Sequence, residues 1–214
     1  MLGRTVGFNS IMLALFAVLT TAIIAGTYLG TRDRIAAAQR AAEEKALLEI
    51  IPAERHDNQM LDDTIPVGPA TELLRLDKDK QIYVARENAE VVAVILPVTA
   101  PDGYSGTIEL IVGVNRDGSV AGVRALQHRE TPGLGDKVDI KKSDWILDFN
   151  GHRLGEPPEA QWAVKKDGGV FDTFTGATIT PRAVTAAVKR GLLYFDANRE
   201  ALLAAGQDGE EDNG

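Results

Sequence analysis

The longest run of hydrophobic positions lies near the amino terminus. No charged residue occurs between Thr5 and Thr31, and residues 11–29 are mostly Ile, Leu, Ala, Val, Phe and Met. At about 1.5 Å of rise per residue, a helix of this length crosses a hydrocarbon core of roughly 30 Å. The pattern predicts a single transmembrane helix over about residues 9–29, inside an anchor at residues 1–31. The alternative is a cleaved signal peptide, whose apolar region would be only about 7–15 residues long.

The next segment, residues 32–52, continues the helix with a different composition. It is rich in Ala, Glu, Lys and Leu, which favour helix, and it ends at Pro52. Leu47, Leu48 and Ile51 fall on one face, which we expect to pack on the domain that follows. The sequence therefore predicts a helical stalk between the anchor and a domain at residues 53–204.

The first part of this domain has the two-residue period of β-strands. Residues 91–96 are almost continuously apolar, as in a central strand that is covered on both faces, whereas Ile108, Leu110 and Val112 alternate as in a half-covered strand. Turn residues separate the apolar runs in pairs, which predicts antiparallel hairpins. The paired runs are residues 81–86 with 91–98, residues 107–114 with 120–126, and residues 161–164 with 170–174.

A helical period follows the last of these runs. A helix that starts at Pro181 has Thr180 as its cap and Pro181 at its first position. It places four apolar residues on one face, namely Val184, Val188, Leu192 and Phe195. Hairpins followed by a packed helix indicate a single α+β domain.

Composition narrows the function. The chain has 214 residues, of which 44% are hydrophobic, enough for one ordinary core beyond the anchor. Its net charge of -8 and its lack of a long basic block argue against a nucleic-acid surface. The absence of cysteine excludes disulfides, thiolate zinc sites and iron–sulfur ligation. Residues 205–214 form an acidic tail with no large apolar side chain, which predicts disorder.

The run from Asp172 to Thr178 precedes the helix and carries the main candidate chemistry. Gly176 permits unusual backbone dihedrals and Ala177 leaves space, so a bulky group can approach the hydroxyl of Thr178. The amides and the positive end of the helix dipole favour a phosphate at this position. A phosphate ester on Thr178 is therefore physically reasonable, and the alternative is a turn that only opens the helix.

A second stretch, residues 128–135, reads His-Arg-Glu-Thr-Pro-Gly-Leu-Gly. Together with Thr175-Gly176-Ala177-Thr178 and the membrane helix, it resembles RnfG, the FMN-binding member of the Rnf (Rsx) electron transport complex. The related NqrC protein of the sodium-translocating NADH:quinone reductase shares the pattern. In this family the last Thr of the (S/T)GAT motif carries FMN through a phosphoester bond, which implies Thr178 here.

The resemblance also implies how the cofactor is attached. A threonine hydroxyl is not acidic enough to attack a pyrophosphate unaided, and no local base is evident in the sequence. The family therefore implies a flavin transferase that uses FAD and magnesium. Asp172 falls within the family motif, which implies that it positions the hydroxyl or a metal brought by the transferase. The alternative is a strand-edge carboxylate that hydrogen-bonds to the turn.

Residues 131–135 suit one edge of a flavin. Pro132 fixes φ at the first central position of a tight turn, and Gly133 supplies a positive φ at the next. Leu134 can contact the dimethylbenzene side of the ring, while the amides of the loop, beginning at Thr131, can hydrogen-bond to its pyrimidine side. The alternative is an ordinary Pro-Gly turn after a strand.

His128 and Glu130 are two residues apart, so on an extended segment both side chains leave the same face. Such a pair can move protons, bind a metal or orient the flavin loop. A metal is the least supported of these roles, since the other histidines, His56 and His152, are distant in sequence.

The function implied by the resemblance is that of an electron-carrying member of a larger complex. It would help couple electron transfer between ferredoxin and NAD(H) to ion translocation, alongside other Rnf subunits, and it would not be catalytic alone. No dinucleotide fingerprint is present in the sequence, so NAD(H) would bind to other subunits. The resemblance places the protein in the bacterial inner membrane as a single-pass protein with a periplasmic domain, although the charges that flank the helix are ambiguous. The alternatives are the NqrC protein of the quinone reductase, a membrane-tethered flavin-binding sensor or binding module, and a scaffold without a cofactor.

Overall fold

The structure, a computed structural model, describes residues 2–76 and 80–205. The chain divides into two compact units, residues 1–42 and residues 43–214. The predicted membrane span falls in the first unit, and the predicted domain falls in the second. From residue 206 onward, the predicted acidic tail lies outside the described residues.

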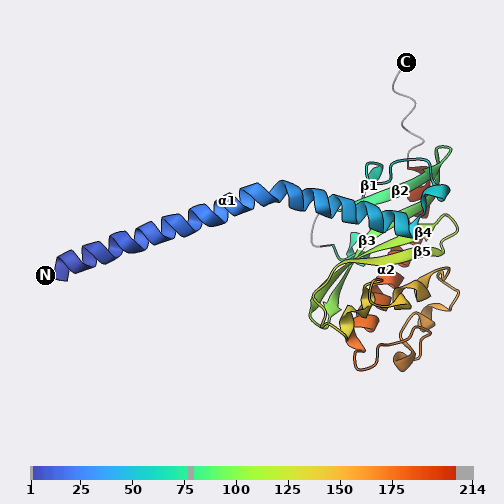
Figure 1. Cartoon of the computed structure of the whole chain (residues 1–214). Helices are drawn as coiled ribbons and strands as arrows, with labels where there is room; N and C mark the ends of the chain where they lie inside the picture. Colours follow the sequence, from blue (N-terminus) through green and yellow to red (C-terminus); the bar gives the residue numbers. More distant parts are fainter. Residues whose placement is uncertain (1, 77–79, 206–214) are drawn as a thin grey trace, which may run out of the picture. The chain divides into compact units, whose positions relative to one another are not determined.

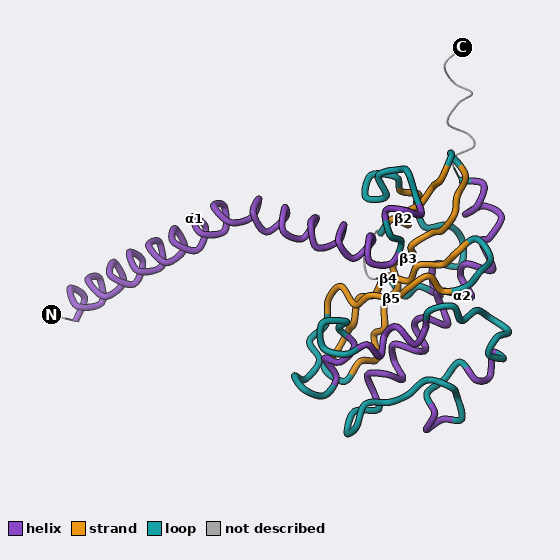
Figure 2. The backbone as a smooth tube through the Cα atoms, turned by 45° about the vertical axis from the view of Figure 1, so that its right-hand side comes forward, coloured by secondary structure: helices purple, strands orange, loops and turns teal. Residues whose placement is uncertain are grey.

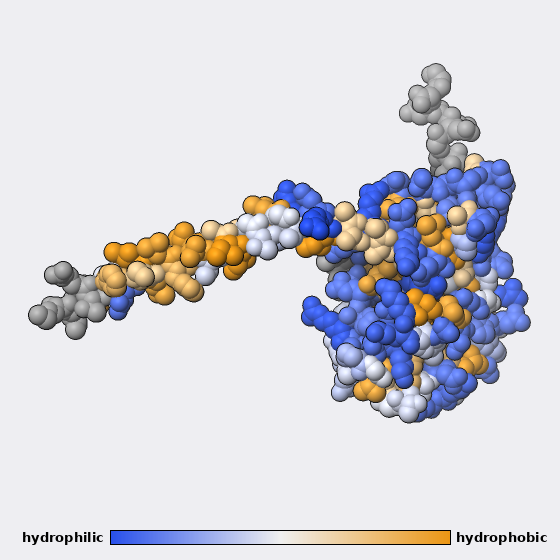
Figure 3. All heavy atoms as spheres, in the orientation of Figure 1, coloured by the Kyte–Doolittle hydropathy of each residue, from blue (hydrophilic) through white to orange (hydrophobic). Residues whose placement is uncertain are grey.

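The first unit consists of most of α1, a helix that runs from Leu2 to Ile50. Among the described residues, α1 is the helix whose length and composition suit a membrane span. None of its apolar stretch is buried by other parts of the protein. Figure 3 shows hydrophobic residues along the visible face of this segment. The hydroxyls of Thr20 and Thr27 donate to carbonyls one turn earlier, so the helix satisfies these polar groups itself.

The second unit is built on a five-stranded antiparallel sheet whose strands follow the order of the chain (Figure 1). Both predicted hairpins in the first part of the domain are confirmed. The strand predicted over residues 91–98 is longer than predicted and runs from Glu90 to Gly103. A short first strand had no clear sequence signal. The strands are β1 (Thr64–Pro66), β2 (Gln81–Glu87), β3 (Glu90–Gly103), β4 (Gly106–Asn115) and β5 (Val120–Gln127).

The central strand, β3, is covered on both faces, as the sequence predicted. One face carries α2, a helix from Ile179 to Ala204 that lies along the sheet (Figure 2). The four apolar residues predicted for its inner face are buried there against alternate residues of β3, such as Leu96. On the other face, Ile95 belongs to a smaller cluster with Leu47 and Ile51, at the end of α1. The sheet is therefore the middle layer of three.

The end of α1 approaches the sheet closely. Gly113 on β4 makes this possible, because a Cβ atom at that position would collide with Cγ2 of Ile50. Arg124 on β5 donates to a carboxylate oxygen of Glu49 at 2.9 Å, which holds the same turn. The predicted packing face needs one correction. Leu48 is exposed, and Ile50 takes its place beside Leu47 and Ile51.

The third predicted hairpin, residues 161–164 with 170–174, is wrong. These segments form no antiparallel ladder: they share one isolated parallel bridge, between Val164 and Phe171, with a few backbone hydrogen bonds around it, and a 3-10 helix, η6 (Lys165–Asp167), joins them. The physical reason is aromatic packing. The ring centroids of Trp162 and Phe171 lie 5.2 Å apart, and those of Phe171 and Phe149 lie 4.5 Å apart. Side-chain burial, and not a strand ladder, therefore sets the path of this segment.

Candidate functional site

The start of α2 lies beside a cavity of about 200 Å³. Three segments that are distant in the sequence meet there: the hairpin tip between β3 and β4, the loop at residues 130–135, and the turn before α2. The cavity brings together the two sequence motifs. Its lining residues are Tyr104, Glu130, Thr131, Leu134, Gly135, Gly176, Ala177, Thr178, Ile179 and Thr180.

The turn before α2 has the backbone geometry that its glycine predicts. The amide of Ala177 donates to the carbonyl of Phe174 at 3.1 Å, and Gly176 has a φ of +82°. Thr175 is exposed at the tip of this turn, and Thr178 is half-buried at the position that caps α2. The turn thus places Thr178 at the N-terminus of α2, where its hydroxyl makes no capping hydrogen bond.

The predicted role of Thr180 as the helix cap is wrong. The helix begins at Ile179, which makes Pro181 its third residue, and within the described chain no side chain caps this end. The hydroxyl of Thr180 is buried and donates instead to a carboxylate oxygen of Glu130. A buried acceptor on another segment has therefore replaced the amides of the helix as its partner.

The loop at residues 131–135 forms the predicted Pro-Gly turn. The amide of Leu134 donates to the carbonyl of Thr131 at 3.1 Å, and Gly133 has a φ of +78°. Pro132 and Gly133 are exposed at the tip of the turn, whereas Leu134 lines the cavity with 41% of its surface exposed. The turn therefore presents an apolar side chain to the cavity.

Glu130 joins the walls of the cavity. Its side chain is only 5% exposed, and its Oε1 atom accepts a hydrogen bond from the amide of Ser105 at 2.9 Å. Its other oxygen accepts from Thr180, so one carboxylate connects the β3–β4 hairpin tip, the loop at residues 130–135 and α2. His128 takes a different position: its Nδ1 atom accepts from the amide of Glu130 at 3.2 Å, and its side chain lines a separate cavity. The structure therefore does not bring these two side chains together at one site.

Three consecutive side chains of η6 hold the segment that carries Thr178. The Nζ atom of Lys165 lies 2.8 Å from the carboxylate of Asp172, and the Nζ atom of Lys166 donates to Oγ1 of Thr178 at 2.8 Å. Asp167 pairs with Arg182 on α2, with an Nη2–Oδ1 distance of 2.8 Å. The hydrogen bond from Arg182 holds the pKa of the Asp167 carboxyl below its ordinary value. We name this set, η6 with its three partners, the η6 clasp.

Sequence reasoning missed Lys166, because it treated residues 165–169 as the turn of a hairpin. The available signal was a pair of lysines shortly before a candidate phosphate-bearing hydroxyl. Asp172 has an exposed carboxylate that faces Lys165, outside the cavity lining. Its backbone carbonyl accepts from the indole of Trp145 at 2.9 Å, and Trp145 itself belongs to the buried core.

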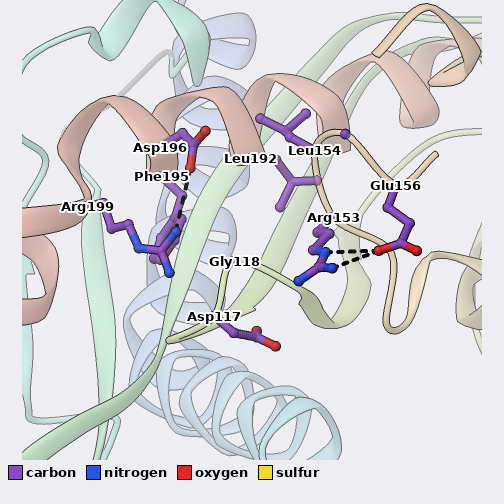
Figure 4. Close-up of a pocket in the computed structure, with 10 residues that line it drawn as sticks. Asp117, Gly118, Arg153, Leu154, Glu156, Leu192, Phe195, Asp196 and Arg199 are labelled. Carbon is purple, nitrogen blue, oxygen red and sulfur yellow. Dashed lines mark hydrogen bonds and ion pairs between the residues drawn. The ribbon is translucent and has the colours of Figure 1, made fainter. Parts of the chain in front are cut away.

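A larger cavity, of about 500 Å³, lies further along α2 and includes none of the predicted site residues (Figure 4). Leu192 and Phe195 form its apolar part. Its charged groups pair with one another or with nearby groups: Arg153 lies 2.7 Å from the carboxylate of Glu156, and Arg199 donates to a backbone carbonyl at 2.7 Å. Within the described chain, each charged side chain that lines this cavity has a partner, so none of them requires a ligand.

Comparison with known proteins identifies the family. Residues 103–193 match the FMN-binding domain family, and residues 1–50 match the RnfG N-terminal region. The G subunit of the ion-translocating oxidoreductase complex of Pseudomonas aeruginosa (strain UCBPP-PA14) is 52% identical over 196 residues, which cover 92% of this chain and 91% of the relative. The chain belongs to this RnfG family. The corresponding proteins of Pseudoalteromonas atlantica and Shewanella loihica are 46% and 47% identical; the first alignment covers 94% of this chain and 93% of the relative, and the second covers 94% of each.

Membership of the RnfG family explains the two units. The FMN-binding match contains both motifs that line the cavity, so this RnfG protein is an electron-transport flavoprotein with an FMN-binding domain. Its relatives are named as parts of an ion-translocating complex, so it acts with other subunits. The exposed apolar part of α1 makes it a membrane-anchored protein.

Proposed function

We propose that this RnfG protein carries FMN as a phosphate ester on Thr178 and relays electrons within its complex. The observation that supports this most strongly is the position of one hydroxyl. Thr178 lies at the start of α2 and lines the cavity that joins both motifs, and its Oγ1 atom lies 2.8 Å from the Nζ atom of Lys166. Helix amides, a lysine and an accessible hydroxyl are the groups that a phosphate ester requires.

The residues around the cavity suit the rest of the cofactor. Tyr104, Leu134 and Ile179 line it and are 66%, 41% and 45% exposed, respectively. Large apolar side chains left open to solvent around a hollow are suited to cover a flat aromatic ring. Thr131 and Gly135 provide backbone groups on the loop side. When bound, FMN supplies reversible electron transfer, and the protein binds it, orients it and shields one side from water.

Attachment of FMN requires an outside enzyme in this proposal. A flavin transferase with magnesium would join Oγ1 of Thr178 to the FMN phosphorus of FAD, break the bond between the two phosphates and release AMP. The hydroxyl proton would pass to a base. Asp172 is a candidate contact for the transferase, because its carboxylate is exposed and lies six residues before Thr178.

The proposed cellular role follows the family. Electrons would move between ferredoxin and NAD(H) through this and other Rnf subunits, coupled to ion translocation. The protein would span the bacterial inner membrane once, over about residues 9–29, with a stalk at residues 32–52 and the FMN-binding domain in the periplasm. Arginines flank the apolar run of α1 on both sides, so we propose this orientation from the family and not from the charges.

The test is replacement of the attachment residue. Full-length wild-type and Thr178→Ala proteins are produced with a flavin transferase and compared by intact-mass and peptide mass spectrometry. We expect one FMN, less a water, on the wild-type peptide that contains Thr178, and none on the variant. Ultraviolet fluorescence of the band on a denaturing gel provides a second measurement.

The matched control is Thr107→Ala, which removes a hydroxyl from an exposed position on β4, outside both motifs. This variant should keep the covalent FMN, and circular dichroism should show that all three proteins are folded. Covalent FMN on Thr178→Ala would refute the proposed attachment. Unmodified wild-type protein in the presence of an active transferase would favour the membrane-tethered binding module instead.

A further inference from the structure

The contact between Lys166 and Thr178 lies within the η6 clasp and is anchored on both sides. Lys165 pairs with Asp172 before the turn, and Asp167 pairs with Arg182 after it. The backbone of η6 is also fixed, since the amide of Gly168 donates to the carbonyl of Lys165 at 3.1 Å. The clasp therefore places the Lys166 ammonium group beside one particular hydroxyl.

We propose that Lys166 positions the hydroxyl of Thr178 for esterification and then neutralises the phosphate of the product. This inference rests on the proposed function, because it concerns the same attachment site. It adds a residue that lies outside both sequence motifs. The ligand is the phosphate group that links the hydroxyl to the flavin.

The first part of the argument is the direction of hydrogen bonds. A lysine ammonium has three donors and no acceptor, whereas a hydroxyl has one donor and two acceptor lone pairs. The bond from Lys166 therefore occupies one lone pair of Oγ1 and leaves the proton of Thr178 free for a base of the transferase. The remaining lone pair can attack phosphorus. Lys166 thus restricts the hydroxyl to orientations that are ready to react.

The second part concerns charge. The transfer forms the bond between Oγ1 and phosphorus, breaks the bond between the two phosphates of FAD, releases AMP and leaves a diester with one negative charge. The ammonium of Lys166 then faces that anion, where a charge-assisted hydrogen bond is stronger than a neutral one. The N-terminus of α2 adds a favourable dipole on the same side.

Access to the contact is open, as a transferase requires. Lys166 is exposed and Thr178 is half-buried, so a second protein can reach the hydroxyl without unfolding the turn. Because Lys166 is exposed, its replacement should also leave the core intact. The role can therefore be tested by substitution.

The experiment measures flavin transfer to the full-length protein in detergent, with purified transferase, FAD and magnesium. Intact mass follows the modified fraction over time at several acceptor concentrations, which separates kcat from the KM for this protein. The variants are Lys166→Met, Lys166→Gln and Lys166→Arg. Lys142→Met is the control for charge, because Lys142 is an exposed lysine in another loop.

For Lys166→Met and Lys166→Gln we expect kcat to fall about tenfold, which corresponds to about 1.4 kcal/mol, with KM unchanged. Lys166→Arg should restore most of the rate, since it keeps the charge and the donors, and Lys142→Met should behave as wild type. Thermal unfolding should show equal stability for all variants. This combination would distinguish positioning from a general structural role.

Three results would overturn the inference about Lys166 while leaving the proposed function intact. They are an unchanged kcat in Lys166→Met and Lys166→Gln, an increase in KM alone, which would make Lys166 a docking contact, and an equal loss in Lys142→Met. If the wild-type protein itself takes up no FMN at Thr178, the proposed function fails, and the inference fails with it.

Discussion

Removal of the Glu130 carboxylate is expected to loosen the candidate FMN site and destabilise the domain. The side chain is 5% exposed and accepts from the amide of Ser105 and the hydroxyl of Thr180. It is also closely enclosed, because a Cβ atom on Gly135 would lie 2.5 Å from its Oε2 atom. Glu130→Ala therefore removes two hydrogen bonds at once and leaves a gap where three segments meet.

The size of the effect follows from these two bonds. A hydrogen bond to a charged group contributes about 1.5–3 kcal/mol. The lower value applies to the bond from Ser105, because this residue is exposed and its freed amide can donate to water. We expect Glu130→Ala to lower the free energy of unfolding by about 3–4.5 kcal/mol. For a protein of this size, the midpoint of thermal unfolding should fall by about 6–18 °C, at about 2–4 °C per kcal/mol.

Glu130→Gln is the matched control, because it keeps the shape and removes the charge. Its amide oxygen can accept from Ser105, and its amino group can donate to Thr180, whose hydroxyl can rotate to accept. The loss should therefore be only about 1 kcal/mol. Urea unfolding of the full-length protein in detergent measures both variants. Fluorescence of Trp145 and Trp162, which are buried in the domain, reports the transition.

Two results would refute this reasoning. One is a Glu130→Ala protein within about 0.5 kcal/mol of wild type, the range of an ordinary surface substitution. The other is a Gln variant that loses as much as the Ala variant, since the charge itself, and not the two hydrogen bonds, would then be what stabilises the site.

Two other regions give predictions of their own. Arg182→Gln should raise the pKa of Asp167 toward its ordinary value of about 3.9, because Arg182 now lowers it. The contribution of this pair to stability is complete above that ordinary value and is lost as pH falls through the lowered pKa; an NMR titration of the carboxyl that gives an unchanged pKa would contradict the contact. Gly113→Ala should destabilise the domain by about 1–3 kcal/mol, because the new Cβ would force Ile50 away from the sheet. An unchanged midpoint in urea would mean that the end of α1 does not depend on this close approach.

Periodicity predicted the parts of the fold that depend on neighbouring residues. The strands β2 to β5 pair with their neighbours in sequence, and α2 buries one stripe of side chains, so local patterns were sufficient. The path of residues 161–174 was predicted wrongly, because it depends on ring packing between Trp162, Phe171 and Phe149. Contacts of that kind cannot be read from the spacing of apolar residues.

The site shows the same division. Its two glycine turns follow from sequence, since Gly133 and Gly176 occupy positions that need a positive φ. The partners of its polar side chains do not. The capping rule assigned the hydroxyl of Thr180 to its own helix, yet a carboxylate 50 residues away in sequence, on Glu130, competes for it in the fold. Lys166 was overlooked for the same reason, since its partner Thr178 is set by how η6 folds back.

These contacts suggest why a relay cofactor would be attached at this point of the domain. The cavity lies at the start of α2, and α2 is fixed to β3 by a buried apolar face. The last turn of α1, around Ile50, packs on the opposite face of the same sheet. The cavity and this turn therefore rest on two buried clusters that pack on opposite faces of one sheet, and close-packed side chains resist displacement. A covalent ester on Thr178 would add the remaining constraint, because it would prevent loss of FMN from the cavity.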